Sequence, residues 1–308
     1  MKEPSYFFLL LFIAFFGEIS QAQIYFNEDF NYSDYNIFKI IGENRERWTF
    51  FHAENQDFNN NRYIDNWEDI KSINFLETNK GNRAIQFNLR RMDDVILRED
   101  VMEKGNINGV EVDYLTFFTH VNRNEIATWD NPNTTAYRPN RKYNFEFEIM
   151  IPDDFEFENE NCDQPSKANY EITGQWHLSH AVLNGHTMPP ISLRIVCDEW
   201  MLNLNPENNS EEKDEDFISL GKIEKGKWTS WKFNFRLSHK NKGFIHINKD
   251  NELVYSQINS KTVFERIAAD GNRTTFYFKI GVYKPHWWSR DTKVSERKVL
   301  FNNVKVYR

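Results

Sequence analysis

The segment YNFEFEI, residues 143–149, decides the fold class of this chain. Apolar side chains occupy every second position, and polar or charged side chains occupy the positions between them. This alternation is the pattern of a β-strand that buries one face and exposes the other. The segment WKFNFRL, residues 231–237, repeats the pattern. Less regular versions follow at residues 85–89, 191–197, 244–247 and 299–306.

Such strands, separated by polar loops, indicate antiparallel sheets that each bury one face. Long helical periodicity is nearly absent from the 308 residues. We therefore predict an all-β fold, a β-jelly-roll sandwich of two antiparallel sheets with a concave substrate groove. No Pro-, Gly- or Ser-rich linker and no internal repeat divides the chain, so residues 23–308 are predicted to form a single domain.

The first 22 residues have the features of a signal peptide. Lys2 supplies a positive charge, residues 6–16 are apolar, and residues 20–22 form a small-x-small cleavage site. The apolar run is too short for a membrane span, and no later segment is long and apolar enough for one. The sequence thus predicts a secreted or periplasmic protein, cleaved after residue 22 and without a membrane span.

The formal net charge of −8 argues against a general nucleic-acid partner, because such binding requires a basic field. A polyanionic ligand would have to be held by a local cationic cleft. The two cysteines, Cys162 and Cys197, either form a disulfide in an oxidising compartment or stay as buried thiols. Without a suitable histidine cluster they form no zinc site, and no metal site is predicted.

Three short segments carry polar side chains at alternate positions: RNEI at 123–126, QWH at 175–177 and YFKIGVYKP at 277–285. If each segment is extended, its polar side chains share one face. In the third, one face carries the apolar residues Phe278, Ile280 and Val282, and the other carries Lys279, Gly281 and Tyr283.

Each of these segments also has an ordinary structural explanation when it is taken singly. Arg123 and Glu125 would form an exposed cross-strand ion pair. His177 would be a surface histidine, and Tyr283 a half-buried aromatic residue with a hydrated hydroxyl group.

Taken together, the segments supply what β-elimination at a uronic acid requires. The reaction needs a base that titrates near neutral pH, a weak acid for the departing oxygen, and groups that neutralise the carboxylate. His177, Tyr283, Arg123 and Gln175 provide these groups. A glycoside hydrolase would instead need two carboxylates flanking the scissile bond, and no strand supplies them.

In the same order along the chain, these segments resemble the R-x-E-L-like, Q-x-H and Y-F-K-x-G-x-Y strands of the jelly-roll polysaccharide lyases. That group includes family 7 alginate lyases, glucuronan lyases and heparin lyase I. The resemblance covers roughly residues 80–308 and implies that Arg123 and Gln175 neutralise the uronate carboxylate. It implies His177 as the base and Tyr283 as the acid, although in some members the tyrosine serves as both.

The resemblance also implies that Lys279 contacts a neighbouring sugar and that Gly281 lets the sugar ring approach the sheet. Trp287 would stack on a sugar face, or it would close the sandwich. Two positions depart from typical alginate lyases: Pro285 stands where they have glutamine, and Trp176 where they have isoleucine or valine. These departures favour the glucuronan and heparin lyase branch.

The sequence leaves the polysaccharide open among alginate, glucuronan, heparin-type chains and ulvan. Recognition of sulfate would need further cations, for which Arg194, Lys284 and Arg290 are candidates. Some relatives hold a structural calcium ion far from the chemistry; no ligands for one can be assigned here, and no cofactor is required for the reaction.

We expect a monomer. The alternative is a non-catalytic, lectin-like sandwich, since the fold hosts both functions.

Overall fold

A computed structural model of the chain describes residues 24–28, 49–52, 73–77, 83–90, 104–107, 110–113, 121–127, 137–178, 189–205, 216–263, 275–285 and 292–308. All regular secondary structure in these residues is β-strand, which confirms the all-β prediction. Within the same residues, no helix is long and apolar enough to cross a membrane.

Two large antiparallel sheets contain most of the described strands. In spatial order the larger sheet contains β15 (Glu252–Ser260), β14 (Gly243–Lys249), β13 (Trp228–Arg236), β8 (Lys142–Met150), β17 (Glu296–Tyr307), β4 (Arg83–Arg90) and β3 (Ile73–Glu77), with β1 (Ile24–Glu28) also paired to β17. The smaller sheet contains β12 (Asp216–Lys222), β11 (Glu199–Leu204), β10 (Ile191–Val196), β9 (Tyr170–Leu178), β16 (Phe276–Pro285), β7 (Val121–Ala127) and β2 (Thr49–His52). A separate hairpin joins β5 (Lys104–Ile107) to β6 (Val110–Asp113).

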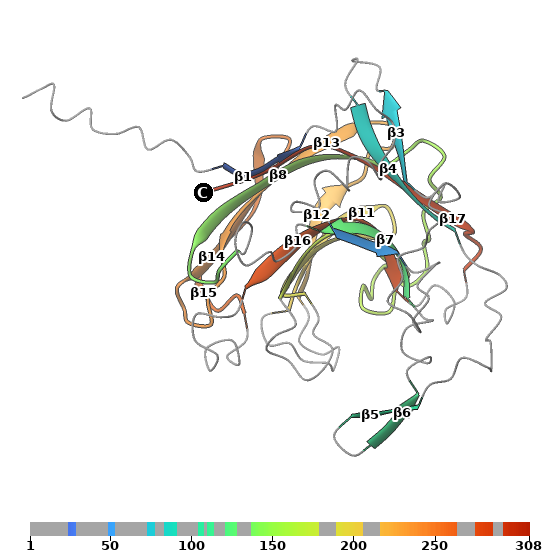
Figure 1. Ribbon diagram of the computed structural model, residues 1–308. Helices are drawn as coiled ribbons and strands as arrows, with labels where there is room; N and C mark the ends of the chain where they lie inside the picture. Colours follow the sequence, from blue (N-terminus) through green and yellow to red (C-terminus); the bar gives the residue numbers. More distant parts are fainter. Residues whose placement is uncertain are drawn as a thin grey trace, which may run out of the picture.

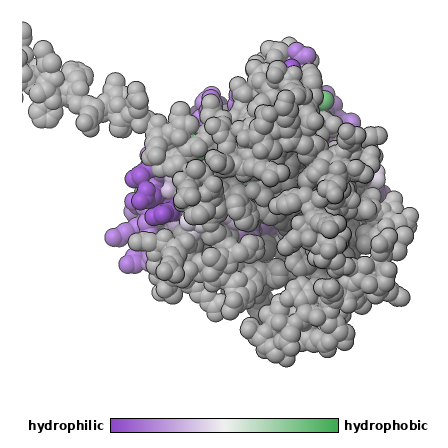
Figure 2. All heavy atoms as spheres, viewed as in Figure 1, coloured by the Kyte–Doolittle hydropathy of each residue, from purple (hydrophilic) through white to green (hydrophobic). Residues whose placement is uncertain are grey.

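The larger sheet curves over the smaller one, and the two form the layers of a jelly-roll sandwich (Figure 1). Strand β8 lies near the middle of the larger sheet, where its alternate residues from Tyr143 to Ile149 are buried, as the sequence predicts. Hydrophilic side chains gather at the edge formed by β14 and β15 (Figure 2). The buried face of the larger sheet therefore points toward the smaller sheet, and the two share one core.

Aromatic rings fill the space between the sheets. Within the larger sheet, Phe145 stacks on Phe235 with ring centroids 5.0 Å apart. From the smaller sheet, Trp176 lies 4.5 Å from Phe233 and 4.9 Å from Phe278, measured between ring centroids. Trp176 is fully buried, so this residue of the QWH segment belongs to the core rather than to the polar face. Truncating a ring of this kind costs about 3–5 kcal/mol.

A disulfide joins Cys162 to Cys197, which settles the alternative left open by the sequence. Cys162 lies in the connection between β8 and β9, and Cys197 lies in the turn between β10 and β11. The bond therefore ties a long surface connection, residues 151–169, to the smaller sheet. Cross-linking residues this far apart in sequence stabilises a fold by about 2–4 kcal/mol.

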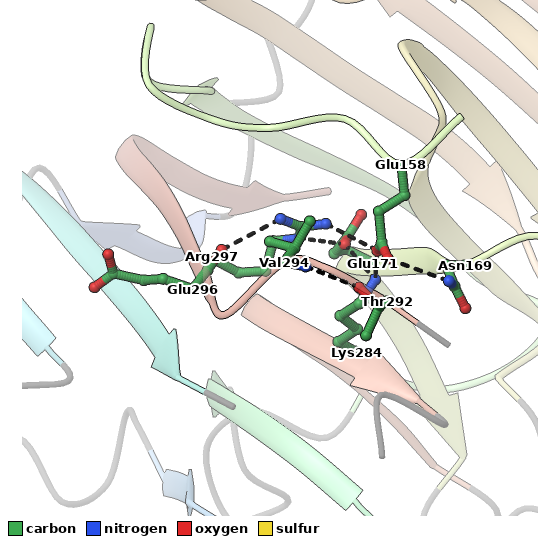
Figure 3. A network of polar contacts seen from close by, with 8 residues as sticks. All are labelled: Glu158, Asn169, Glu171, Lys284, Thr292, Val294, Glu296 and Arg297. Carbon is green, nitrogen blue, oxygen red and sulfur yellow. Dashed lines mark hydrogen bonds and ion pairs between the residues drawn. The ribbon is translucent and has the colours of Figure 1, made fainter. Parts of the chain in front are cut away.

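A buried ionic network links the smaller sheet to the larger one (Figure 3). Glu171 of β9 accepts hydrogen bonds from Lys284 of β16 and Arg297 of β17. Glu158, from the connection between β8 and β9, contacts the same two cations. All four side chains are buried, and two carboxylates balance two cations, which is the condition under which buried charges are tolerated.

The network corrects one prediction. Lys284 lies on the core side of β16 and is held by two carboxylates, so it is not available to recognise sulfate. The network also perturbs Glu171. Burial alone would raise the pKa of this carboxyl group, but the charges and hydrogen bonds of Lys284 and Arg297 outweigh it and lower the pKa below its ordinary value.

We predict that Glu171→Gln lowers the free energy of unfolding at pH 7 by about 3–5 kcal/mol, because it leaves two buried cations with one carboxylate. A carboxyl group with a lowered folded-state pKa stabilises the fold above its unfolded pKa near 4.5 and loses that contribution as the pH falls further. The difference in unfolding free energy between wild type and the Glu171→Gln variant should therefore decrease below pH 4.5, as measured by urea unfolding. Glu252→Gln, at an exposed residue, is the control and should stay within about 0.5 kcal/mol of wild type. A difference in unfolding free energy that is the same at every pH would contradict a lowered pKa for Glu171.

Candidate active site

The three polar segments of the sequence lie on three neighbouring strands. β16 is the middle strand, with β9 on one side and β7 on the other. Phe278, Ile280 and Val282 of β16 pack into the core, so the alternate residues point the other way. We call this side of the smaller sheet, which carries Glu125, Gln175, His177, Lys279 and Tyr283, the outer face.

The strand register brings the predicted residues opposite one another. Lys279 pairs with Gln175 of β9. Farther along β16, Tyr283 pairs with Arg123 of β7. Gly281 lies between these two rows and pairs with Glu125. The predicted carboxylate-binding residues thus flank the glycine, although for Arg123 only the strand position is described.

Gly281 has a backbone conformation that favours glycine. Its φ angle is +143°, in a region that residues with a side chain rarely adopt. The register between β16 and β9 also shifts between Ile280 and Tyr283, so a β-bulge lies at this point. Bulges often redirect a side chain next to an active site. The glycine is therefore required by the backbone itself, in addition to the close approach of a sugar that the sequence predicts.

Glu125 lies in a buried polar cluster, not in the exposed ion pair that is one explanation from the sequence. Its side chain is 1% exposed. One carboxylate oxygen accepts a hydrogen bond from the Gln175 side-chain amide, and the other lies 3.9 Å from the Lys279 ammonium group. The Lys279 ammonium also lies 5.4 Å from the centroid of the Tyr277 ring. A single sequence cannot show this cluster, because Glu125 reaches Gln175 across the intervening strand β16.

His177 and Tyr283 differ from this cluster because both are half-buried. The His177 imidazole stacks on the ring of Tyr277, its partner in the register, with centroids 5.5 Å apart. Tyr283 packs at the border of a small apolar cluster that includes Ile172 and Met201. The two groups predicted to exchange protons with a substrate are therefore more accessible than the buried Gln175 that lies between their rows.

Arg194 lies in β10, next to β9 in the same sheet. The guanidinium group lies between two aromatic rings, 4.4 Å from the centroid of Tyr170 and 5.1 Å from that of Phe217. It also donates hydrogen bonds to Ser192 and Asn203. The side chain is fully buried, so the structure does not support Arg194 as an exposed sulfate ligand.

Two further candidates, Trp287 and Arg290, lie outside the described residues. The part of the chain that the structure describes holds no cluster of three or more His, Cys, Asp or Glu side chains placed to bind a metal ion.

Comparison with known proteins identifies the family to which this chain belongs. The Polysaccharide lyase family matches residues 44–305, most of the chain. This chain belongs to that family. None of the curated protein sequences matches this lyase significantly. Family membership makes the chain a polysaccharide lyase rather than a lectin-type binding module.

Solved structures agree on the fold. The endo-β-1,4-glucuronan lyase of the fungus Trichoderma reesei is 15% identical, with a TM-score of 0.54 over 84% of this chain and 94% of that chain. The marine PL-14 alginate lyase of Aplysia kurodai is 9% identical, with a TM-score of 0.53 over 92% of this chain and 99% of that chain. At these identities the likeness establishes a common jelly-roll fold and leaves the substrate of this lyase open.

The backbone of Gly281 generates a prediction. Gly281→Ala should lower the free energy of unfolding by about 1–3 kcal/mol, because alanine is strained at a φ angle of +143°. It should also reduce lyase activity, since it adds a methyl group between the two rows of polar residues. Thermal unfolding and steady-state kinetics measure the two effects.

Gly174→Ala is the matched control for this substitution. Gly174 lies opposite Ile280 in the neighbouring strand, and an added Cβ would meet its nearest atoms at 3.6 Å or more, an ordinary contact distance. A Gly281→Ala enzyme as stable as the Gly174→Ala enzyme would show that position 281 does not need glycine.

Proposed function

We propose that this lyase cleaves a uronic-acid polysaccharide by β-elimination on the outer face of the smaller sheet. One observation supports the proposal: in the register of β7, β9 and β16, Tyr283 pairs with Arg123, Lys279 with Gln175 and Tyr277 with His177, on both sides of Gly281. The proposal rests on this placement together with membership of the Polysaccharide lyase family.

In the proposed reaction, a base removes the proton from the carbon next to the uronate carboxylate. The electron pair forms a carbon–carbon double bond, the glycosidic carbon–oxygen bond breaks, and an acid protonates the departing oxygen. The intermediate carries negative charge beside a carboxylate that is already charged. Arg123 and the Gln175 amide would reduce this cost by donating hydrogen bonds to the carboxylate.

We assign Tyr283 as the acid and His177 as the base. Tyr283 stands two positions from Gly281 along β16, on the Arg123 side. His177 pairs with Tyr277, four positions from Gly281 in the other direction. A sugar acid above Gly281 would thus be approached by the two proton-exchanging groups from opposite ends of the row. Imidazole titrates near neutral pH, and a phenol can donate to an alkoxide, which suits these roles.

The substrate class follows from the chemistry of the face and from the relatives. A guanidinium and an amide fit a carboxylate, and the structural neighbours act on glucuronan and alginate. We further propose that residues 1–22 are a signal peptide, that the lyase is exported as a single domain, and that it works on polysaccharide outside the cytoplasm.

The activity is tested with a panel of alginate, glucuronan, heparin and ulvan. Each β-elimination creates a conjugated uronate, whose ultraviolet absorbance should rise during incubation with at least one of these polymers. Mass spectrometry of the products should show unsaturated ends. Cleavage that adds water and creates no absorbance would contradict the proposal.

We expect Tyr283→Phe to lower kcat by about 10²–10⁴ while substrate binding changes little, because it removes only the proton-donating hydroxyl group. His177→Ala should cause a loss of similar size if the imidazole is the base. His246→Ala is the control, since His246 lies in the larger sheet and hydrogen bonds to Ser256. A Tyr283→Phe enzyme with full activity would remove the phenol from the mechanism, and a fully active His177→Ala enzyme would assign both proton transfers to Tyr283.

A further inference from the structure

We propose that Glu125 is a positioning residue, which holds the Gln175 amide with its nitrogen toward the substrate carboxylate. The proposal rests on the function proposed above. Sequence reasoning assigns Glu125 only a surface ion pair, whereas the structure places its carboxylate between two groups of the site.

The contact spans a strand. Glu125 lies in β7 and Gln175 in β9, and β16 runs between them. The residue of β16 opposite Glu125 is Gly281, which has no side chain. The Glu125 and Gln175 side chains can therefore meet above β16, where the Gln175 Nε2 atom donates to Glu125 Oε1. Gly281 thus makes room for this hydrogen bond.

The hydrogen bond decides which way the amide points. An amide can rotate by half a turn and exchange its nitrogen and oxygen, and the oxygen would repel a carboxylate. A carboxylate only accepts hydrogen bonds, so Glu125 selects the orientation that turns the nitrogen toward β16. Arg123 and Tyr283 lie on that side. The second N–H of the amide is then left to donate to the uronate.

Lys279 explains how a carboxylate can occupy this place. A buried negative charge beside a uronate would repel the substrate and would also be costly by itself. The Lys279 ammonium, 3.9 Å away and 3% exposed, balances that charge. The pair is neutral as a whole, so Glu125 can orient the amide without adding net negative charge beneath the substrate.

The proposal separates the geometry of Glu125 from its charge. Glu125→Gln keeps the length of the side chain and an acceptor oxygen, whereas Glu125→Asp keeps the charge on a side chain one methylene shorter. We expect Glu125→Ala and Glu125→Gln to lower kcat by about 10–100-fold, the size typical of groups that orient a functional side chain. A glutamine can donate as well as accept, so it would no longer select one orientation of the Gln175 amide. Glu125→Asp should lose less than about tenfold, because it keeps a carboxylate that only accepts hydrogen bonds. Most of each loss should fall on kcat rather than on KM, since the negative charge at the carboxylate grows in the transition state.

A double-mutant cycle tests whether Glu125 acts through Gln175. In a Gln175→Ala background, Glu125→Ala should cause almost no further loss, because the amide that it orients is absent. Glu199→Ala is the matched control. Glu199 lies in β11 of the same sheet, accepts a hydrogen bond from Ser219 at 2.6 Å and pairs with Lys222 at 3.2 Å, and its substitution should leave kcat unchanged. Thermal unfolding of every variant identifies losses that come from misfolding; if Glu125→Ala does not fold, the comparison of Glu125→Gln with Glu125→Asp still decides.

Four results would overturn the inference. In the first three, wild type produces unsaturated ends and Gln175→Ala is impaired, which leaves the proposed function standing. The inference then fails if Glu125→Ala is as active as Glu199→Ala. It also fails if the double variant Glu125→Ala, Gln175→Ala loses kcat by the product of the two single losses. It also fails if Glu125→Gln keeps wild-type activity, because a group that only accepts hydrogen bonds would then not be needed. A wild type that produces no unsaturated ends on any polymer would remove the proposed function and this inference together.

Discussion

Packing of Trp176 against Phe278 and Phe233 fixes how β9 and β16 lie on the larger sheet, and the outer face depends on it. Side chains alternate along a strand, so a slip of one residue would exchange the core side for the polar side. Trp176 stands between Gln175 and His177 in the sequence. The same ring that fills the core therefore obliges its two polar neighbours to point away from it.

The alternating segments predicted the all-β architecture correctly because burial of one face dictates a period of two. The pattern of residues 143–149 is matched by β8. That Gln175 and Tyr283 belong to one site was implied only by the resemblance of the three polar segments to those of the lyases. Contacts between side chains on different strands could not be predicted from the sequence. The ion pair partners of Lys284 come from β9 and from the connection between β8 and β9, and no local pattern reveals such partners. The bulge near Gly281 was also hidden, since a glycine in a strand has several explanations.

Charges on β16 are paired on both of its sides. Lys279 on the outer face lies near Glu125, and Lys284 on the core side contacts Glu158 and Glu171. Both ammonium groups are buried, and β16 can carry them only because each has carboxylate partners. The charges beneath the site that we propose for an anionic sugar thus nearly cancel. Electrostatic attraction of the substrate would therefore come from other groups, such as Arg123.

The bond between Cys162 and Cys197 has a practical consequence for anyone who prepares this lyase. It fastens the same connection that carries Glu158, so one covalent cross-link and one ionic network hold a single surface segment. A reducing cytosol does not form such bonds. Protein made in that compartment and protein exported through an oxidising one would differ in the anchoring of this segment, and batches from the two expression routes should not be treated as the same material.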